Sequence, residues 1–177
     1  PEVTAAAAWN PQLAEMVKQE GTHLVYDSSQ IPGEILDTLA VNTATLKANP
    51  DFAKALTGAW FETLALMSKG DAASTAAKTQ MARLSGTDLA GYESQLKTTK
   101  LFYTPQDALA FATAPALLAS NDLVRKFSFD HGLLGEGAAD ADVIGIAFPG
   151  VKVLGDPQNI KLRFDASFVQ MAAEGKL

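Results

Sequence analysis

Cysteine is absent from the 177-residue chain, and histidine occurs only twice. Without cysteine, the chain has no disulfides, no thiolate nucleophile and no cysteine-ligated zinc or iron–sulfur site. His23 and His131 have no partner at the spacing of metal ligands on a helix, so we expect structural or surface roles for both and no metal site. No Gly-x-Ser-x-Gly motif marks a nucleophilic serine, so we expect no catalytic residue.

Basic residues are also in short supply. Lys and Arg number 14 against 20 Asp and Glu, which gives a net charge of −6. This balance argues against sequence-independent nucleic-acid binding and against docking on an anionic membrane, because both need basic surfaces. No apolar run reaches the roughly 18 residues of a membrane-spanning helix. Apolar residues nevertheless make up 47% of the chain, which is enough for a globular core.

The first 42 residues alternate between strand-like and helix-like patterns. Short apolar runs predict strands at residues 3–8, 23–26 and 35–41. Between the first two, Asn10 is expected to cap a helix that begins at Pro11. This β-α-β order indicates an α/β fold class.

The rest of the chain is predicted to be rich in helix. Residues 43–131 carry mostly helical patterns, including a long helix that begins at Asn49-Pro50 and turns Trp60 toward the core. Gly132, Gly135 and Gly137 follow a helix rather than a strand, so we interpret them as a helix end and not as a dinucleotide-binding loop. We therefore expect no cofactor. A short apolar run occupies residues 143–148, and the alternation of apolar and basic residues at 160–164 predicts an exposed strand. A closing helix is predicted over residues 165–176.

Candidate ligand-binding residues gather near the first turns. Trp9 lies at a predicted strand-to-helix corner, where open α/β sheets bind ligands. Ser28 and Ser29 offer hydroxyl groups in the loop that follows the second predicted strand. Glu34 and Asp37 would share a face at a helix start and oppose each other on a strand. They either contact a cationic or amide ligand or form a solvated turn.

The order of several motifs resembles the substrate-binding proteins of ABC importers, in the branch that takes nitrate, taurine and aliphatic sulfonates. The resemblance begins with Ala7-Ala8-Trp9-Asn10-Pro11 before a helix. It continues through the loop at residues 28–37 and through Asn49-Pro50 at the start of a long helix. The closing segments resemble the subgroup associated with urea carboxylase clusters; they are residues 127–135, 159–165 and 172–177.

This resemblance implies a periplasmic-binding-protein type II-like α/β fold with two lobes and a cleft. Members of the family are about twice as long, so the chain would correspond to a helix-rich C-terminal half. Residues 1–20 would end the second lobe and form the hinge, and residues 21–177 would complete the first lobe. The N-terminal half would then be a separate chain or a segment that has been removed. The implied protein is periplasmic or lipid-anchored, has no catalytic activity and delivers its solute to an ABC permease.

The implied solute is small, polar and nitrogenous, such as urea, an amide or a guanidine-like compound. Its alternatives are a sulfonate, taurine, nitrate or a pyrimidine precursor. A second alternative is an enzyme of thiamine-pyrimidine synthesis on the same fold, which would need a reactive histidine or cysteine. A third alternative is a stand-alone helical interaction domain. The resemblance and the residue chemistry together indicate the ligand-binding residues Trp9, Asn10, Asp27, Ser28, Ser29, Glu34 and Asp37.

Overall fold

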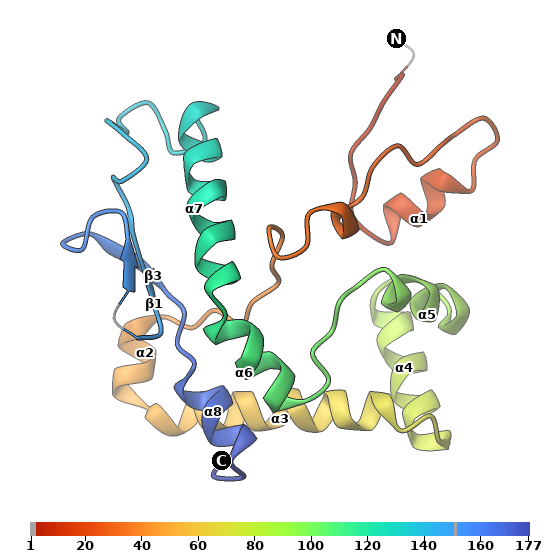
Figure 1. Ribbon diagram of the computed structural model, residues 1–177. Coiled ribbons are helices and arrows are strands. Elements are labelled where there is room, and N and C mark those ends of the chain that lie inside the picture. Colours follow the sequence, from red (N-terminus) through yellow and green to blue (C-terminus); the bar gives the residue numbers. More distant parts are fainter. Residues whose placement is uncertain (1–2, 151) are drawn as a thin grey trace. The chain divides into compact units, whose positions relative to one another are not determined.

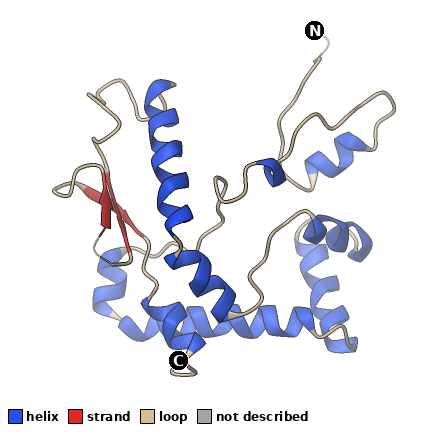
Figure 2. Cartoon of the chain, in the orientation of Figure 1, coloured by secondary structure: helices blue, strands red, loops and turns tan. Residues whose placement is uncertain are grey.

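The computed structural model describes residues 3–150 and 152–177 (Figure 1). The chain is a mixed α/β protein in which helices predominate and one small sheet is present (Figure 2). The helices are α1 (Gln12–Val17), η1 (Ser28–Gln30, a 3₁₀ turn), α2 (Thr43–Ala48), α3 (Pro50–Ser68), α4 (Ala72–Leu84), α5 (Leu89–Lys97), α6 (Pro105–Thr113), α7 (Pro115–Asp130) and α8 (Ser167–Ala173). The strands are β1 (Gly145–Phe148), β2 (Lys152–Leu154) and β3 (Ile160–Arg163).

Two compact units divide the chain. Unit 1 comprises the residues up to Gln30 together with Thr63–Leu101, and unit 2 comprises Ile31–Glu62 together with Phe102–Leu177. Helix α3 contributes its first part to unit 2 and its last turns to unit 1. The boundary expected near residue 20 concerns the lobes of a larger protein and stays a prediction. In the part of the chain that the structure describes, no helix is long and apolar enough to cross a membrane.

Unit 1 is organised around the turn from α3 into α4. Asp71 is the N-cap of α4 and its side chain accepts a hydrogen bond from the Ser74 amide at 2.8 Å. The Ser74 hydroxyl donates to the carbonyl oxygen of Met67 at 2.8 Å and is fully buried. These bonds satisfy backbone groups that helix ends leave unpaired. Helix α5 packs against α4.

In unit 2, helix α6 begins with a capped turn. Thr104 caps α6 by accepting a hydrogen bond from the Asp107 amide, and its hydroxyl donates to the Asp107 carboxylate at 2.7 Å. Pro105 occupies the first helical turn, where a missing amide hydrogen costs nothing. Helix α6 packs against α8, and the Gln106 side chain donates to the Ala173 carbonyl at 3.0 Å.

The sheet in unit 2 has the order β2-β1-β3. Strand β2 runs antiparallel to β1, whereas β3 runs parallel to it. Phe148 on β1 is buried and stacks on Phe164, with 5.0 Å between the ring centroids. The exposed strand predicted at residues 160–164 is therefore present as β3, and the apolar run at residues 143–148 contains β1.

Helix α7 ends as its sequence predicts. Gly132 has a φ of 71°, a left-handed conformation that glycine adopts without strain. Its amide donates to the Phe129 carbonyl, and the Leu133 amide donates to the Ser128 carbonyl at 2.8 Å. This is the Schellman arrangement, which closes a helix. The glycine-rich run therefore begins with a helix end, as expected.

The three strands predicted in the first 42 residues are wrong. Residues 3–8, 23–26 and 35–41 form neither helix nor strand and are mostly exposed. A strand needs a neighbouring backbone to accept and donate its hydrogen bonds, and no described segment pairs with these three. The α/β class is correct, but the strands that the described residues form are β1, β2 and β3, near the C-terminus.

Two predictions about individual side chains are also wrong. Helix α1 begins at Gln12, and Asn10 does not cap it; Pro11 occupies the cap position and makes no side-chain cap bond. Trp60 is 43% exposed rather than part of the core. It lies seven residues from buried Ala53 and from buried Met67, so it shares a helix face with them. The neighbouring residues bury the small Ala53 and the flexible Met67 but do not enclose the larger indole of Trp60.

Candidate functional site

Trp9 and Asn10 lie in unit 1 immediately before α1. The Trp9 carbonyl accepts a hydrogen bond from the Leu13 amide at 2.8 Å, while the residue is 71% exposed. Its backbone therefore supports the start of the helix and leaves a large apolar ring accessible. Asn10 is exposed, and its side chain bonds to none of the described residues. Its amide can act as both donor and acceptor toward a ligand.

Asp27 and Ser29 form a tight polar turn in the same unit. One carboxylate oxygen of Asp27, Oδ1, accepts hydrogen bonds from the Ser29 hydroxyl and from the Ser29 amide, the latter at 2.9 Å. The Ser29 hydroxyl, followed by its amide, lowers the pKa of Asp27 below the ordinary value of 3.8. The carboxylate is thus anionic at neutral pH. Its second oxygen, Oδ2, accepts no hydrogen bond from the described residues.

Ser28 extends the hydrogen-bonding capacity of this turn. It is exposed, and its hydroxyl has no partner within the described part of the chain. A free hydroxyl can donate or accept, whereas the Ser29 hydroxyl is already committed as a donor to Asp27. The turn therefore presents a carboxylate acceptor beside an adaptable hydroxyl, which suits a ligand with N–H groups.

Glu34 and Asp37 belong to unit 2. Glu34 is half-buried in the turn that follows Gly33, and its amide donates to the Ile31 carbonyl at 3.2 Å. Asp37 is exposed in an irregular segment, so neither the helical nor the strand arrangement of this pair is present. Neither carboxylate contacts a cationic group among the described residues.

The structure thus brings together only some of the predicted site residues. It brings Asp27, Ser28 and Ser29 into one turn, and it places Trp9 and Asn10 in the same unit. The two carboxylates of unit 2 are not part of that turn. A single site made from all of the predicted residues stays a prediction.

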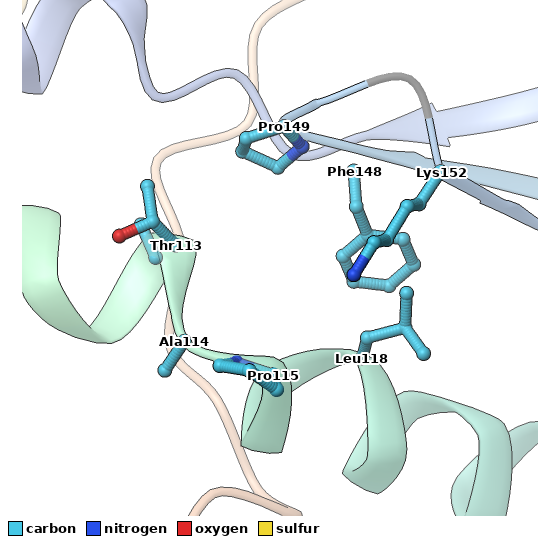
Figure 3. Close-up of a pocket in the computed structure, with 8 residues that line it drawn as sticks. Thr113, Ala114, Pro115, Leu118, Phe148, Pro149 and Lys152 are labelled. Atoms are coloured by element: carbon cyan, nitrogen blue, oxygen red, sulfur yellow. The ribbon is translucent and has the colours of Figure 1, made fainter.

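A small recess in unit 2 was not predicted. It lies between the α6–α7 junction and the side chains of Phe148, Pro149 and Lys152, and its volume is about 30 Å³ (Figure 3). That volume holds about one or two water molecules, far less than the roughly 300 Å³ of a small ligand pocket. No sequence pattern marked it, because its walls are distant in the chain. The lining residues are Ala112, Thr113, Ala114, Pro115, Leu118, Phe148, Pro149 and Lys152.

A second feature that the sequence reasoning missed is an ionic cluster around Arg125. Its guanidinium donates to Asp122 at 2.8 Å, to Asp142, and to the Ala141 carbonyl at 3.0 Å. Lys126 pairs with the other oxygen of Asp122 at 2.7 Å. The hydrogen bond from Lys126, followed by that from Arg125, lowers the pKa of Asp122. Each of these charges has a partner, so the cluster fastens α7 to the following turn.

Comparisons of this chain with protein-family models, with curated proteins and with solved structures find no match. Across residues 3–150 and 152–177, no group of three or more histidine, aspartate or glutamate side chains could hold a metal ion. The candidate site with the most suitable chemistry is therefore the exposed set in unit 1: Trp9, Asn10 and the Asp27–Ser29 turn.

Proposed function

We propose that this chain is part of the solute-binding component of an ABC importer. It captures a small nitrogenous solute, such as urea, an amide or a guanidine-like compound, and delivers it to a membrane permease. The proposed fold is the periplasmic-binding-protein type II arrangement, and the proposed location is periplasmic or lipid-anchored. The observation that carries this proposal is the Asp27–Ser29 turn, because its anionic carboxylate has an oxygen available for N–H groups.

The chemistry of unit 1 favours a donor-rich solute. A carboxylate binds guanidinium and amide N–H groups through charge-assisted or strong hydrogen bonds. The side chain of Asn10 can accept from an N–H group and donate to a carbonyl oxygen of the same solute. The exposed Trp9 ring can cover a flat solute and attract a cation to its face. Sulfonate and nitrate lack N–H donors and would be repelled by Asp27, so they are the weaker alternative.

The distribution of buried and exposed side chains supports a larger assembly. The buried apolar residues of the described chain are Ala53, Leu64, Met67, Ala82, Leu117 and Phe148. Large apolar side chains are exposed in both units, including Trp9, Val25 and Phe127. A core this small gives little stability. We therefore propose that further polypeptide, the other half of a two-lobed protein, covers part of these surfaces and completes the cleft.

Calorimetric titration tests the proposal. The protein is purified together with any polypeptide that accompanies it in its own cells, and it is titrated with urea, acetamide, guanidinium, taurine and nitrate. We expect guanidinium, acetamide or urea to bind, and Trp9→Ala and Asn10→Ala to weaken that binding about tenfold or more. Trp60→Phe serves as the control, because it changes the other tryptophan without touching the candidate site.

The charge on Asp27 separates the solute classes. Asp27→Asn removes the charge and keeps the shape, so it should weaken guanidinium binding more than acetamide or urea binding. Preferential binding of taurine or nitrate would instead support the alternative solute class. Turnover of a titrated compound would indicate an enzyme. Binding that Trp9→Ala, Asn10→Ala and Asp27→Asn all leave unchanged would refute this site.

A further inference from the structure

Glu34 and Asp37, the two carboxylates of unit 2, have no role in the proposed solute site. Asp37 lies in a segment whose backbone is unpaired. Residues 36–41 have the apolar pattern of a strand but form no backbone hydrogen bond with any described residue. Leu39 is 50% exposed. An extended apolar segment with unpaired backbone groups is suited to pairing with the edge of a sheet.

The same unit contains an open edge with the opposite charge. Strand β3 lies at one end of the order β2-β1-β3, so no strand of the described residues pairs with one side of its backbone. Lys161 and Arg163 are exposed on β3 and form no ion pair with the described residues. Since they are two residues apart on a strand, they lie on one face of the sheet. This basic face is notable in a chain whose net charge is −6.

The other face of β3 is apolar and continues across the sheet. Ile146 on β1 is in register with Leu154 on β2 and with Leu162 on β3. Leu162 ends this row and is 45% exposed. Successive residues of a strand point to opposite faces of the sheet. In a further strand beside β3, an apolar residue could therefore lie next to Leu162, and the residue after it would lie on the same face as Lys161 and Arg163.

We propose that residues 36–41 of one copy of this chain add to the β3 edge of a second copy, and that the exchange is reciprocal. Placing Leu36 beside Leu162 extends the apolar row. It also places Asp37 beside Arg163 if the strands are parallel and beside Lys161 if they are antiparallel. A two-fold axis relates the two additions, so each copy donates one strand and receives one.

Charged residues on an edge strand commonly protect it from unwanted pairing. Lys161 and Arg163 would repel a basic strand and give a neutral one no attraction, whereas an acidic strand is attracted. Their presence thus selects among possible partners. Because the charges are exposed, salt should weaken the pairing.

Sedimentation velocity tests the dimer on the full chain, over about 5 to 500 µM protein and at about 50 and 500 mM salt. We expect a monomer–dimer equilibrium that weakens at the higher salt. Asp37→Lys alone, and Lys161→Glu with Arg163→Glu, should each weaken dimerisation about tenfold or more, because each places like charges side by side. Lys152→Glu on β2, the other edge strand, is the matched control and should leave the dimer unchanged.

An equal mixture of the two charge-reversed proteins gives the decisive result. In the mixed dimer, the lysine introduced by Asp37→Lys in the first variant faces the two glutamates of the second. The unchanged β3 of the first variant faces the unchanged Asp37 of the second. The mixture should therefore form dimers more tightly than either variant does alone.

Three results would overturn the proposal. One is a wild-type protein that stays monomeric at every concentration and salt. Another is a mixture of the two charge-reversed proteins that does not associate, and the third is a dimer that Lys152→Glu disrupts equally. These readouts do not depend on solute binding.

Discussion

Replacing Ser74 with alanine tests how the turn between α3 and α4 stabilises unit 1. The Ser74 side chain is fully buried, and its hydroxyl donates to the Met67 carbonyl at 2.8 Å. Met67 lies in the last turn of α3, where carbonyl groups have no amide partner within the helix. The Ser74 hydroxyl is therefore the donor that satisfies this carbonyl, and alanine cannot replace it.

The magnitude follows from burial. An ordinary intramolecular hydrogen bond contributes about 1 kcal/mol, but leaving a buried carbonyl unpaired costs about 1–3 kcal/mol. Met67 is itself buried, at 8% exposure, so water has little access to the unpaired group. We expect Ser74→Ala to lower the free energy of unfolding by about 2 kcal/mol. At a urea dependence of about 2 kcal/mol per M, this moves the midpoint by about 1 M.

Urea unfolding followed by circular dichroism measures this loss, and Ser68→Ala provides a matched control. The Ser68 hydroxyl also donates to a carbonyl of α3, that of Ala65 at 2.9 Å, but this bond is exposed. Water can replace it, so the control should cost less than about 0.5 kcal/mol. Equal losses in the two variants, or no loss in Ser74→Ala, would refute the argument from burial.

Two further predictions concern a carboxyl group and a pair of turns. The pKa of Asp27 should lie below 3.8, and Ser29→Ala should raise it toward that value, as NMR titration of the carboxyl carbon would show. Because the folded-state pKa is depressed, the associated stability is present above the unfolded pKa and is lost as the pH falls through the folded value. Gly155→Ala should destabilise the chain by about 3 kcal/mol, because φ is +73° and the new Cβ would fall on the Ile144 carbonyl oxygen. Gly150→Ala, with φ of +79° and nothing nearby, should cost only about 1 kcal/mol, so thermal melting of the two variants should differ clearly.

Several helix ends can be predicted from the sequence because their signals are local, although the predicted Asn10 cap of α1 is absent. Thr104 and Asp107 lie three residues apart, and their mutual hydrogen bonds need no distant partner. The Gly132 turn is equally local, since the bonds that close α7 join residues within one turn. Side chains and backbone groups that meet within three or four residues can be inferred directly from the sequence.

Long-range features were less predictable. The Arg125 cluster joins α7 to Asp142, and the recess beside Phe148 joins two helices to a strand turn. Nothing in the local sequence indicates which distant residue will meet another. The candidate ligand-binding site follows the same division. The Asp27–Ser29 turn is local and is present, whereas the inclusion of Glu34 and Asp37 in one site would need long-range contacts.

The failed strand predictions indicate what the exposed segments require. Their apolar residues favour the half-buried surface of a β-sheet. A strand forms there only when another strand lies beside it. Residues 36–41 retain the pattern without the partner, while β3 retains an open edge without a strand. A wrong prediction for the isolated chain can therefore be a correct prediction for an assembly. The mixed charge-reversal experiment distinguishes these cases, because only a segment that pairs with β3 depends on the sign of Asp37 relative to Lys161 and Arg163.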